Sequence, residues 1–133
     1  MKVVGIVQGR MGSSRLPGKV MMSLGPKITI DHVISRLNQA KNINLVVVAT
    51  SQNHEDDVIE NWCKDNNVKV FRGSESDVLD RYYATAMAFG ADVIVRITAD
   101  CPLIDPDVVD QVVDSFFEGN FDAIGLSGGF SDG

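Results

Sequence analysis

The residues best suited to chemistry lie close together in one segment, residues 8–19. This segment contains three cations, Arg10, Arg15 and Lys19, together with three glycines and two serines. Glycine lets the backbone approach an anion closely, and successive amides can form a concave set of donors. Arginine and lysine pair readily with phosphate oxygens. The composition therefore predicts a polyphosphate site, against the alternative of an ordinary surface loop in which glycine, proline and solvated cations are common.

Neither standard phosphate-binding motif is present in this segment. Gly9 and Gly12 lack the G-x-G-x-x-G spacing, and Pro17 interrupts it. Gly18-Lys19 matches the end of a P-loop, but Ser13 replaces its first glycine and Val20 replaces its magnesium-binding hydroxyl. The segment is thus a cationic loop of another type.

Asp100 is the best candidate for a metal ligand. It follows the apolar run Asp92–Ile97, which has the pattern of a buried strand. Ligands of parallel sheets bind at the carboxyl ends of the strands, and Mg²⁺ prefers hard oxygen ligands such as carboxylates. The alternative is that Asp100 only shapes the turn before Pro102, which is a common role for aspartate.

Other charged residues have simpler explanations near helix ends. Asp105 followed by Pro106 is typical of a helix start, so we expect Asp105 to be an N-cap. Glu55, Asp56 and Asp57 lie near another expected helix start, where acidic side chains interact favourably with the helix dipole.

Arg72 and Arg81 form a second tier of candidates. Arg72 follows the third expected strand on its binding side, and Arg81 lies on the helix after it. Each could contact a ligand, or could form a surface ion pair worth less than about 1 kcal/mol.

Strand patterns and helix patterns alternate strictly along the chain. Short β-branched runs predict strands at Lys2–Gln8, Leu45–Thr50, Val68–Phe71, Asp92–Ile97 and Phe121–Leu126. Between these strands, apolar residues recur with the spacing of a helix. Examples are Val78, Leu79, Tyr82, Tyr83 and Ala86. Gly90 and Gly119 stand where helices should stop. This order predicts an α/β fold with a mainly parallel sheet and helices on its faces.

The charge and composition of the chain indicate which kinds of molecule it is expected to bind. The 133 residues carry a net charge of −6, but residues 1–50 hold seven Lys or Arg against one acid. An acidic protein is a poor general ligand for nucleic acid or an anionic membrane, whereas a cationic end suits a small anion. No apolar run approaches the ~20 residues of a membrane span, and the amino terminus lacks signal-peptide features. Cys63 and Cys101 lack metal spacing, so we expect reduced thiols and a cytoplasmic location.

Arg10-x-x-Ser13-x-Arg15-Leu16-Pro17-Gly18-Lys19 resembles the signature of the sugar-acid cytidylyltransferases, which act on 3-deoxy-manno-octulosonate or acylneuraminate. The branch labelled spore coat polysaccharide biosynthesis protein F is the most similar. Residues 46–51, 70–74, 77–83 and 95–105 also resemble segments of this family. Gly9 replaces the usual alanine, which we expect to loosen the backbone slightly.

The resemblance implies a fold and an activity. We expect one domain over residues 1–133, an α/β/α sandwich of the Rossmann-like nucleotide-diphospho-sugar transferase type. The resemblance covers about the amino-terminal half of family members, so we expect the sandwich to be incomplete at its carboxyl end. The remaining half should carry a second metal carboxylate, most of the sugar pocket and the contacts of a homodimer. The implied reaction joins CTP to a sugar or sugar acid for cell-surface polysaccharide synthesis with Mg²⁺ as cofactor, and we expect this chain alone to be poorly active.

The resemblance also assigns roles to individual residues. Arg10, Lys19 and Asp100 are the expected catalytic residues, with Asp100 as the Mg²⁺ ligand. The expected nucleotide-binding residues are Gln8, Gly9, Arg10, Gly12, Ser13, Arg15, Lys19, Arg72, Arg81 and Thr98. Two alternatives stay open, a non-catalytic nucleotide-binding module and a nucleotide-sugar-dependent glycosyltransferase. The second would usually show a D-x-D motif, and Asp105-Pro106-Asp107 is the one such triplet.

Overall fold

The computed structural model describes residues 1–12, 18–99, 102–119 and 124–126. Its central sheet contains five strands in the order β5-β4-β1-β6-β7, and every neighbouring pair is parallel. These strands span Val3–Gln8 (β1), Leu45–Ser51 (β4), Lys69–Gly73 (β5), Val93–Thr98 (β6) and Ile124–Leu126 (β7). The expected α/β class and mainly parallel sheet are therefore confirmed.

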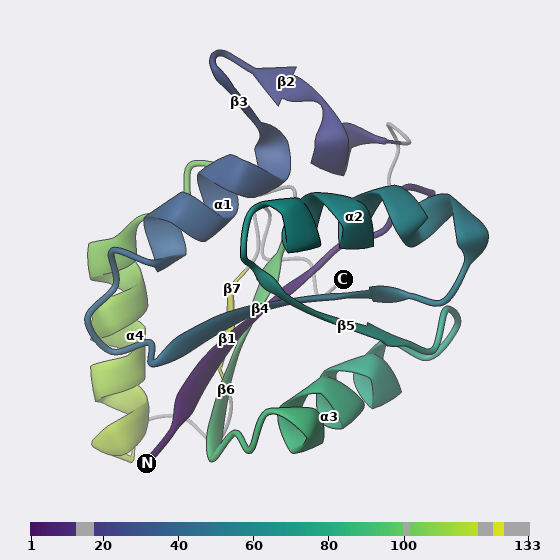
Figure 1. Ribbon diagram of the computed structural model, residues 1–133. Helices are drawn as coiled ribbons and strands as arrows, with labels where there is room; N and C mark the ends of the chain where they lie inside the picture. Colours follow the sequence, from purple (N-terminus) through teal and green to yellow (C-terminus); the bar gives the residue numbers. More distant parts are fainter. Residues whose placement is uncertain (13–17, 100–101, 120–123, 127–133) are drawn as a thin grey trace.

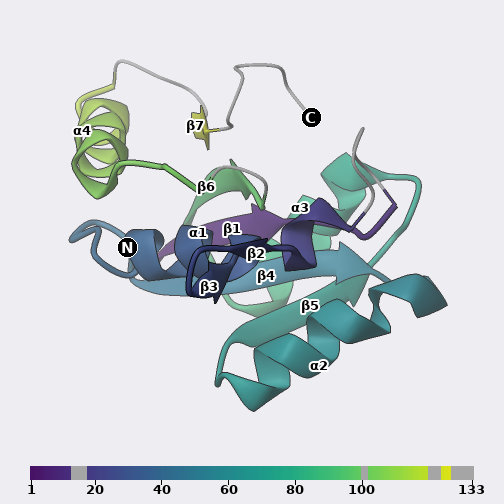
Figure 2. The same ribbon diagram turned by 90° about the horizontal axis from the view of Figure 1, so that it is seen from above.

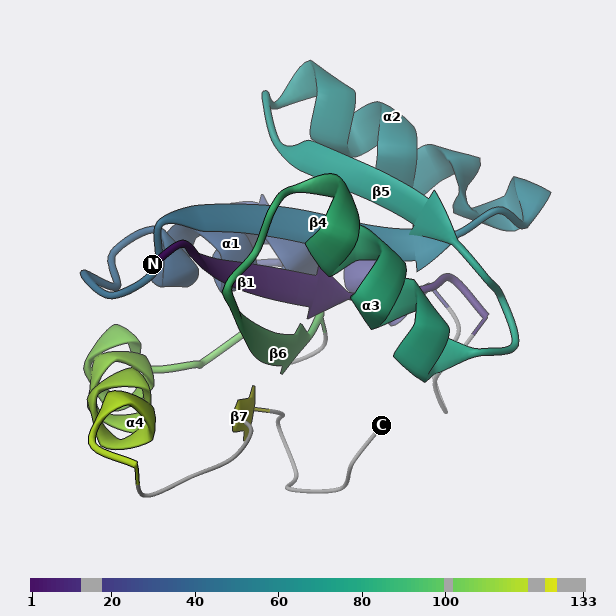
Figure 3. The same ribbon diagram turned by 90° about the horizontal axis from the view of Figure 1, so that it is seen from below.

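Helices cover both faces of this sheet (Figure 1). They are α1 (Thr29–Leu37), α2 (Asp57–Asp65), α3 (Val78–Ala88) and α4 (Pro106–Phe117), with 3-10 turns η1 (Lys19–Met21) and η2 (His54–Asp56). Helices α1, α2 and α4 share one apolar core with the sheet. Helix α3 packs on the opposite face, against β1 and β4, as Figure 3 shows.

The pleat of the strands divides the core into two layers. Val7 and Val48 point to the face of α1, α2 and α4, and Ile6 and Ala49 point to that of α3. Cys63 of α2 is buried in the first layer, and its burial raises the thiol pKa to about 12. A thiol with that pKa stays protonated at neutral pH.

The predicted helix boundaries are largely confirmed. The Asp105 carboxylate accepts a hydrogen bond from the backbone N–H of Asp107 at 2.9 Å, so it caps α4, with Pro106 in the first turn. Gly90 and Gly119 follow α3 and α4 with φ angles of 64° and 83°, a left-handed conformation that favours glycine. None of the helices in the described part of the chain is long and apolar enough to cross a membrane.

A short hairpin was not predicted from the sequence. Strands β2 (Ser23–Leu24) and β3 (Lys27–Ile28) form a two-stranded antiparallel hairpin beside α1, seen from above in Figure 2. Each strand has two residues, which is too short to show the period-two pattern on which sequence reasoning relies.

Candidate active site at the carboxyl ends of β1 and β6

The predicted phosphate loop begins directly after β1, the central strand. Ala99 donates its backbone N–H to the carbonyl of Gln8 at 2.8 Å, and Gly9 donates to the carbonyl of Ala49 at 3.2 Å. The carboxyl ends of β6 and β4 therefore flank the start of the loop. This edge is where ligands bind in folds of this class.

The two ends of the loop meet near its base. Gly18 donates its backbone N–H to the carbonyl of Met11 at 2.6 Å, and its φ of 80° is one that glycine tolerates best. Val20 of η1 packs against Gly9. The hydrogen bond between Gly18 and Met11 closes the loop, and Arg10 and Lys19 lie just outside this bond, one on each strand of the loop's base. Ser13 and Arg15, predicted to bind nucleotide, lie outside the described residues.

Position 9 has no room for a side chain, which the sequence did not reveal. A Cβ at this position would lie 2.7 Å from the Cβ of Ala99 and 3.3 Å from Cγ2 of Val20. The first distance is too short for two carbon atoms, and the Ala99 Cβ cannot move without its backbone. The close approach between the ends of β1 and β6 thus requires glycine, so the expectation that Gly9 merely loosens the backbone is corrected.

Asp56 anchors the start of the loop. Its side chain is fully buried, and Oδ1 accepts a hydrogen bond from the backbone N–H of Met11 at 2.7 Å. Oδ2 accepts a hydrogen bond from the hydroxyl of Ser51 at the end of β4. Asp56 does lie at a helix start, as expected, but its contacts with Met11 and Ser51 were not predicted. No local pattern signals a contact that spans 45 residues of sequence.

Gly12 lies at the exposed surface of the turn after Met11. A Cβ there would lie 2.7 Å from Oε1 of Glu55, so this part of the loop faces a carboxylate. Since Glu55 is an exposed and flexible side chain, it can move away from an incoming anion.

Gln8 and Thr98 are register partners at the ends of β1 and β6. By the alternation of the strands, both side chains lie on the α3 face with Ile6 and Ile94. The Thr98 hydroxyl is buried and has no hydrogen-bond partner among the described residues. Two of the predicted nucleotide-binding residues therefore stand side by side at this edge of the sheet.

Arg72 is engaged within the protein. Its guanidinium donates to the carbonyls of Ser51 (2.8 Å) and Asn53 (2.7 Å), and to the carboxylates of Asp57 (2.6 Å) and Glu60 (3.1 Å). These contacts tie β5 to β4 and α2. Arg72 therefore forms the ion pair that the sequence left open as an alternative. Its contact with a nucleotide stays a prediction.

Arg81 is fully buried in α3, and its environment differs from that of Arg72. The Nη1 atom donates to the carbonyl of Ser74 at 2.6 Å, whereas Nε and Nη2 have no hydrogen-bond partner in the described structure. Burial, and secondarily the nearby charge of Arg10, lower the pKa of Arg81. Arg10 and Arg81, both predicted from the sequence, are thus brought close together.

The predicted metal ligand, Asp100, lies outside the described residues. Within the described ranges, no three His, Cys, Asp or Glu side chains gather in a way that could hold a metal. Ala99, the residue before Asp100, is buried at the carboxyl edge beside the phosphate loop. A carboxylate offers the oxygen ligands that Mg²⁺ prefers, and a magnesium-binding role for Asp100 stays a prediction.

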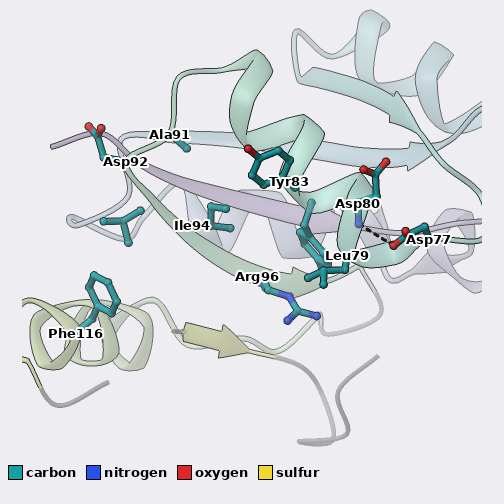
Figure 4. Close-up of a pocket in the computed structure, with 11 residues that line it drawn as sticks. Asp77, Leu79, Asp80, Tyr83, Ala91, Asp92, Ile94, Arg96 and Phe116 are labelled. Carbon is teal, nitrogen blue, oxygen red and sulfur yellow. Dashed lines mark hydrogen bonds between the residues drawn. The ribbon is translucent and has the colours of Figure 1, made fainter. Parts of the chain in front are cut away.

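A separate groove of about 710 Å³ opens over β6 between α3 and α4. Figure 4 shows Leu79 and Tyr83 of α3 across from Ile94 and Phe116. Leu79 and Tyr83 are 70% and 64% exposed, so these two residues, whose helical spacing helped to predict α3, do not enter the core.

The groove is poorly suited to a triphosphate. Three carboxylates, Asp77, Asp80 and Asp92, line it against one arginine, Arg96, whose guanidinium lies 4.6 Å from the centre of the Tyr82 ring. Net negative charge would repel an anionic ligand. The loop after β1 is therefore the better candidate for phosphate binding.

Comparison with known proteins identifies the family. The sequence profile of the cytidylyltransferases matches residues 4–128. The chain belongs to the cytidylyltransferase family. The spore coat polysaccharide biosynthesis protein SpsF of Bacillus subtilis is 40% identical over 117 residues, which are 85% of this chain and 49% of that protein.

Solved cytidylyltransferase structures share this fold. A cytidylyltransferase from Leptospira borgpetersenii is 43% identical with a TM-score of 0.83, over 89% of this chain and 50% of the other. A CMP:2-keto-3-deoxy-manno-octonic acid synthetase solved in complex with CTP is 27% identical with a TM-score of 0.74, over 89% and 48%. The chain thus spans about half the length of these relatives.

Proposed function

We propose that the protein binds CTP at the loop after β1 and, in its full-length form, transfers CMP to a sugar or sugar acid. The observation that carries this proposal is the closed loop at the carboxyl end of β1, with Arg10 and Lys19 at its ends. The names of the relatives support the substrate classes, since one acts in spore coat polysaccharide synthesis and another was solved with CTP. We also propose that the protein acts in the cytoplasm and that its product is used to synthesise cell-surface polysaccharide.

In the proposed reaction, a hydroxyl oxygen of the sugar attacks the α-phosphorus of CTP, and the bond to pyrophosphate breaks. Catalysis of such transfers depends mainly on positioning and on stabilising developing charge. Arg10, Arg15 and Lys19 would bind the triphosphate and neutralise the charge that grows on pyrophosphate. Ser13 and the backbone amide of Gly12 would add neutral donors.

A magnesium ion is the proposed cofactor, and Asp100 is the residue that would hold it. When bound, Mg²⁺ would supply stabilisation of the charge that develops during the transfer. The Asp105-Pro106-Asp107 triplet offers no competing metal site, because Asp105 caps α4. This observation disfavours the glycosyltransferase alternative, which would need that triplet as its metal motif.

The test measures pyrophosphate release with CTP, Mg²⁺ and candidate sugar acids. We expect release from a full-length form, and weak nucleotide binding with poor turnover from the 133-residue chain. No release from the full-length form with any nucleoside triphosphate would contradict the enzymatic proposal. Nucleotide binding without any release would instead favour the non-catalytic binding module.

A further inference from the structure

The backbone around Lys19 is fixed from two directions. On the side of the phosphate loop, the backbone N–H of Gly18 donates to the carbonyl of Met11 at 2.6 Å. On the other side, the carbonyl of Lys19 accepts a hydrogen bond from the backbone N–H of Met22 at 3.1 Å, and Met22 directly precedes β2. Lys19 therefore lies between the base of the loop and the start of the β2–β3 hairpin.

Met22 is held in turn by Thr29, the first residue of α1. Both the backbone N–H and the hydroxyl of Thr29 donate to the carbonyl of Met22, at 2.9 Å and 3.1 Å. Thr29 is buried, and a buried hydroxyl needs a hydrogen-bond partner, which here is that carbonyl. A short chain of hydrogen bonds thus leads from α1 through Met22 to the backbone of Lys19.

His32 makes a second contact between α1 and the hairpin. Its Nε2 atom lies 2.6 Å from the carbonyl oxygen of Leu24 in β2. Because a carbonyl oxygen only accepts, the ring N–H of His32 is the donor. Thr29 and His32 are three positions apart and so lie on one face of α1, at the end that β3 enters (Figure 1). We call these two side chains the hairpin clamp.

The clamp matters for phosphate binding because lysine has a long and flexible side chain. Ordering such a side chain around a ligand costs conformational entropy. The cost is lower when the backbone below it is already fixed, and binding groups act best when neighbouring hydrogen bonds hold them in place. The contacts of Thr29 and His32 supply this support for residues 19–24.

We propose that Thr29 and His32 are positioning residues for the phosphate site. By holding Met22 and Leu24 against α1, they fix the backbone from which Lys19 reaches the outer phosphates of CTP. The inference rests on the proposed function, because it concerns a lysine of the same site. It adds two residues that do not themselves contact the nucleotide.

The experiment titrates the 133-residue chain with CTP and with CMP in the presence of Mg²⁺, by NMR or isothermal calorimetry. Thr29→Val removes the hydroxyl and keeps the shape of the side chain. We expect the affinity for CTP to fall about three- to tenfold, the range that corresponds to one hydrogen bond. The affinity for CMP should change less than about twofold, because CMP lacks the outer phosphates. Thr29→Ser keeps the hydroxyl and should bind CTP as the unmodified chain does.

A double-mutant cycle with Lys19→Ala tests whether Thr29 acts through Lys19. Once Lys19 is replaced, we expect Thr29→Val to have no further effect on the affinity for CTP. A residue that only stabilises the fold would weaken binding in both backgrounds. Ser35→Ala on α1 is the matched control: the Ser35 hydroxyl bonds to the side chains of Lys27 and Asp31, so its loss should leave CTP binding unchanged.

Each outcome decides a different statement. Equal affinity for CTP in a folded Thr29→Val protein and the unmodified chain would overturn this inference and leave the proposed phosphate site standing. An equal loss with and without Lys19 would also overturn it. If Thr29→Val does not fold, His32→Leu, which removes the contact with Leu24, takes its place with the same expected results. If the unmodified chain bound no CTP, the proposed function would fail and this inference with it.

Discussion

The ends of β1 and β6 approach each other closely at Gly9 and Ala99. Gly9→Ala would force a Cβ to within 2.7 Å of the Ala99 Cβ, and such overpacking typically costs about 1–3 kcal/mol. We therefore expect a lower free energy of unfolding, measured by urea denaturation. Ala99→Gly removes the opposing methyl group, so the double variant should recover part of the loss. Additive losses in this double-mutant cycle would show that the contact is not responsible.

Asp56 gives a second prediction at the level of one residue. Asp56→Asn removes a buried charge that accepts hydrogen bonds from Met11 and Ser51, so we expect a loss of about 1–3 kcal/mol. Hydrogen exchange at the Met11 amide should also become faster. Asp65→Asn at the exposed end of α2 is the control and should change little. Equal effects of the two substitutions would contradict an anchoring role for Asp56.

An ion pair between Arg72 and Asp57 joins β5 to α2. The hydrogen bond from Arg72 lowers the pKa of Asp57 below its ordinary value of 3.8, with a smaller contribution from His54. A lowered pKa means that the ion pair stabilises the fold above the ordinary pKa and ceases to do so as the carboxylate becomes protonated.

Urea midpoints at several pH values test this junction. We expect Asp57→Asn to be less stable than the unmodified protein at pH 5, and the gap to close as the pH falls toward 3. A gap that stays constant from pH 5 to pH 3 would show that the ion pair does not contribute.

For the secondary-structure elements, the sequence predicted the main strands and helices because each is long enough to show its apolar periodicity. It could not predict the β2–β3 hairpin, whose strands have two residues each. Leu79 and Tyr83 follow the helical period but lie on the exposed side of α3, because apolar periodicity does not show what covers a face. The anchoring role of Asp56 could not be predicted, because Met11, which donates a hydrogen bond to it, lies 45 residues away in the sequence.

Across the whole molecule, the acidic and basic side chains are unevenly distributed. Residues 51–133 carry five Lys or Arg against seventeen acids, while the proposed phosphate loop lies in the basic part, residues 1–50. The sequence predicted this loop from residue types alone, and the fold places its start at the carboxyl edge of the central strand. The proximity of Arg10 and Arg81 depends on the fold, because 71 positions separate them in the sequence and no local pattern links them.

The central claim is that this loop binds the phosphates of CTP, and an NMR titration tests it most directly. Adding CTP with Mg²⁺ should shift the backbone amides of Gly9, Met11, Gly12 and Lys19, and CMP should shift them far less. Lys19→Ala should weaken the binding of CTP much more than that of CMP, because lysine pairs with the outer phosphates. Shifts confined to the α3–α4 groove, with the loop amides unchanged, would contradict the account.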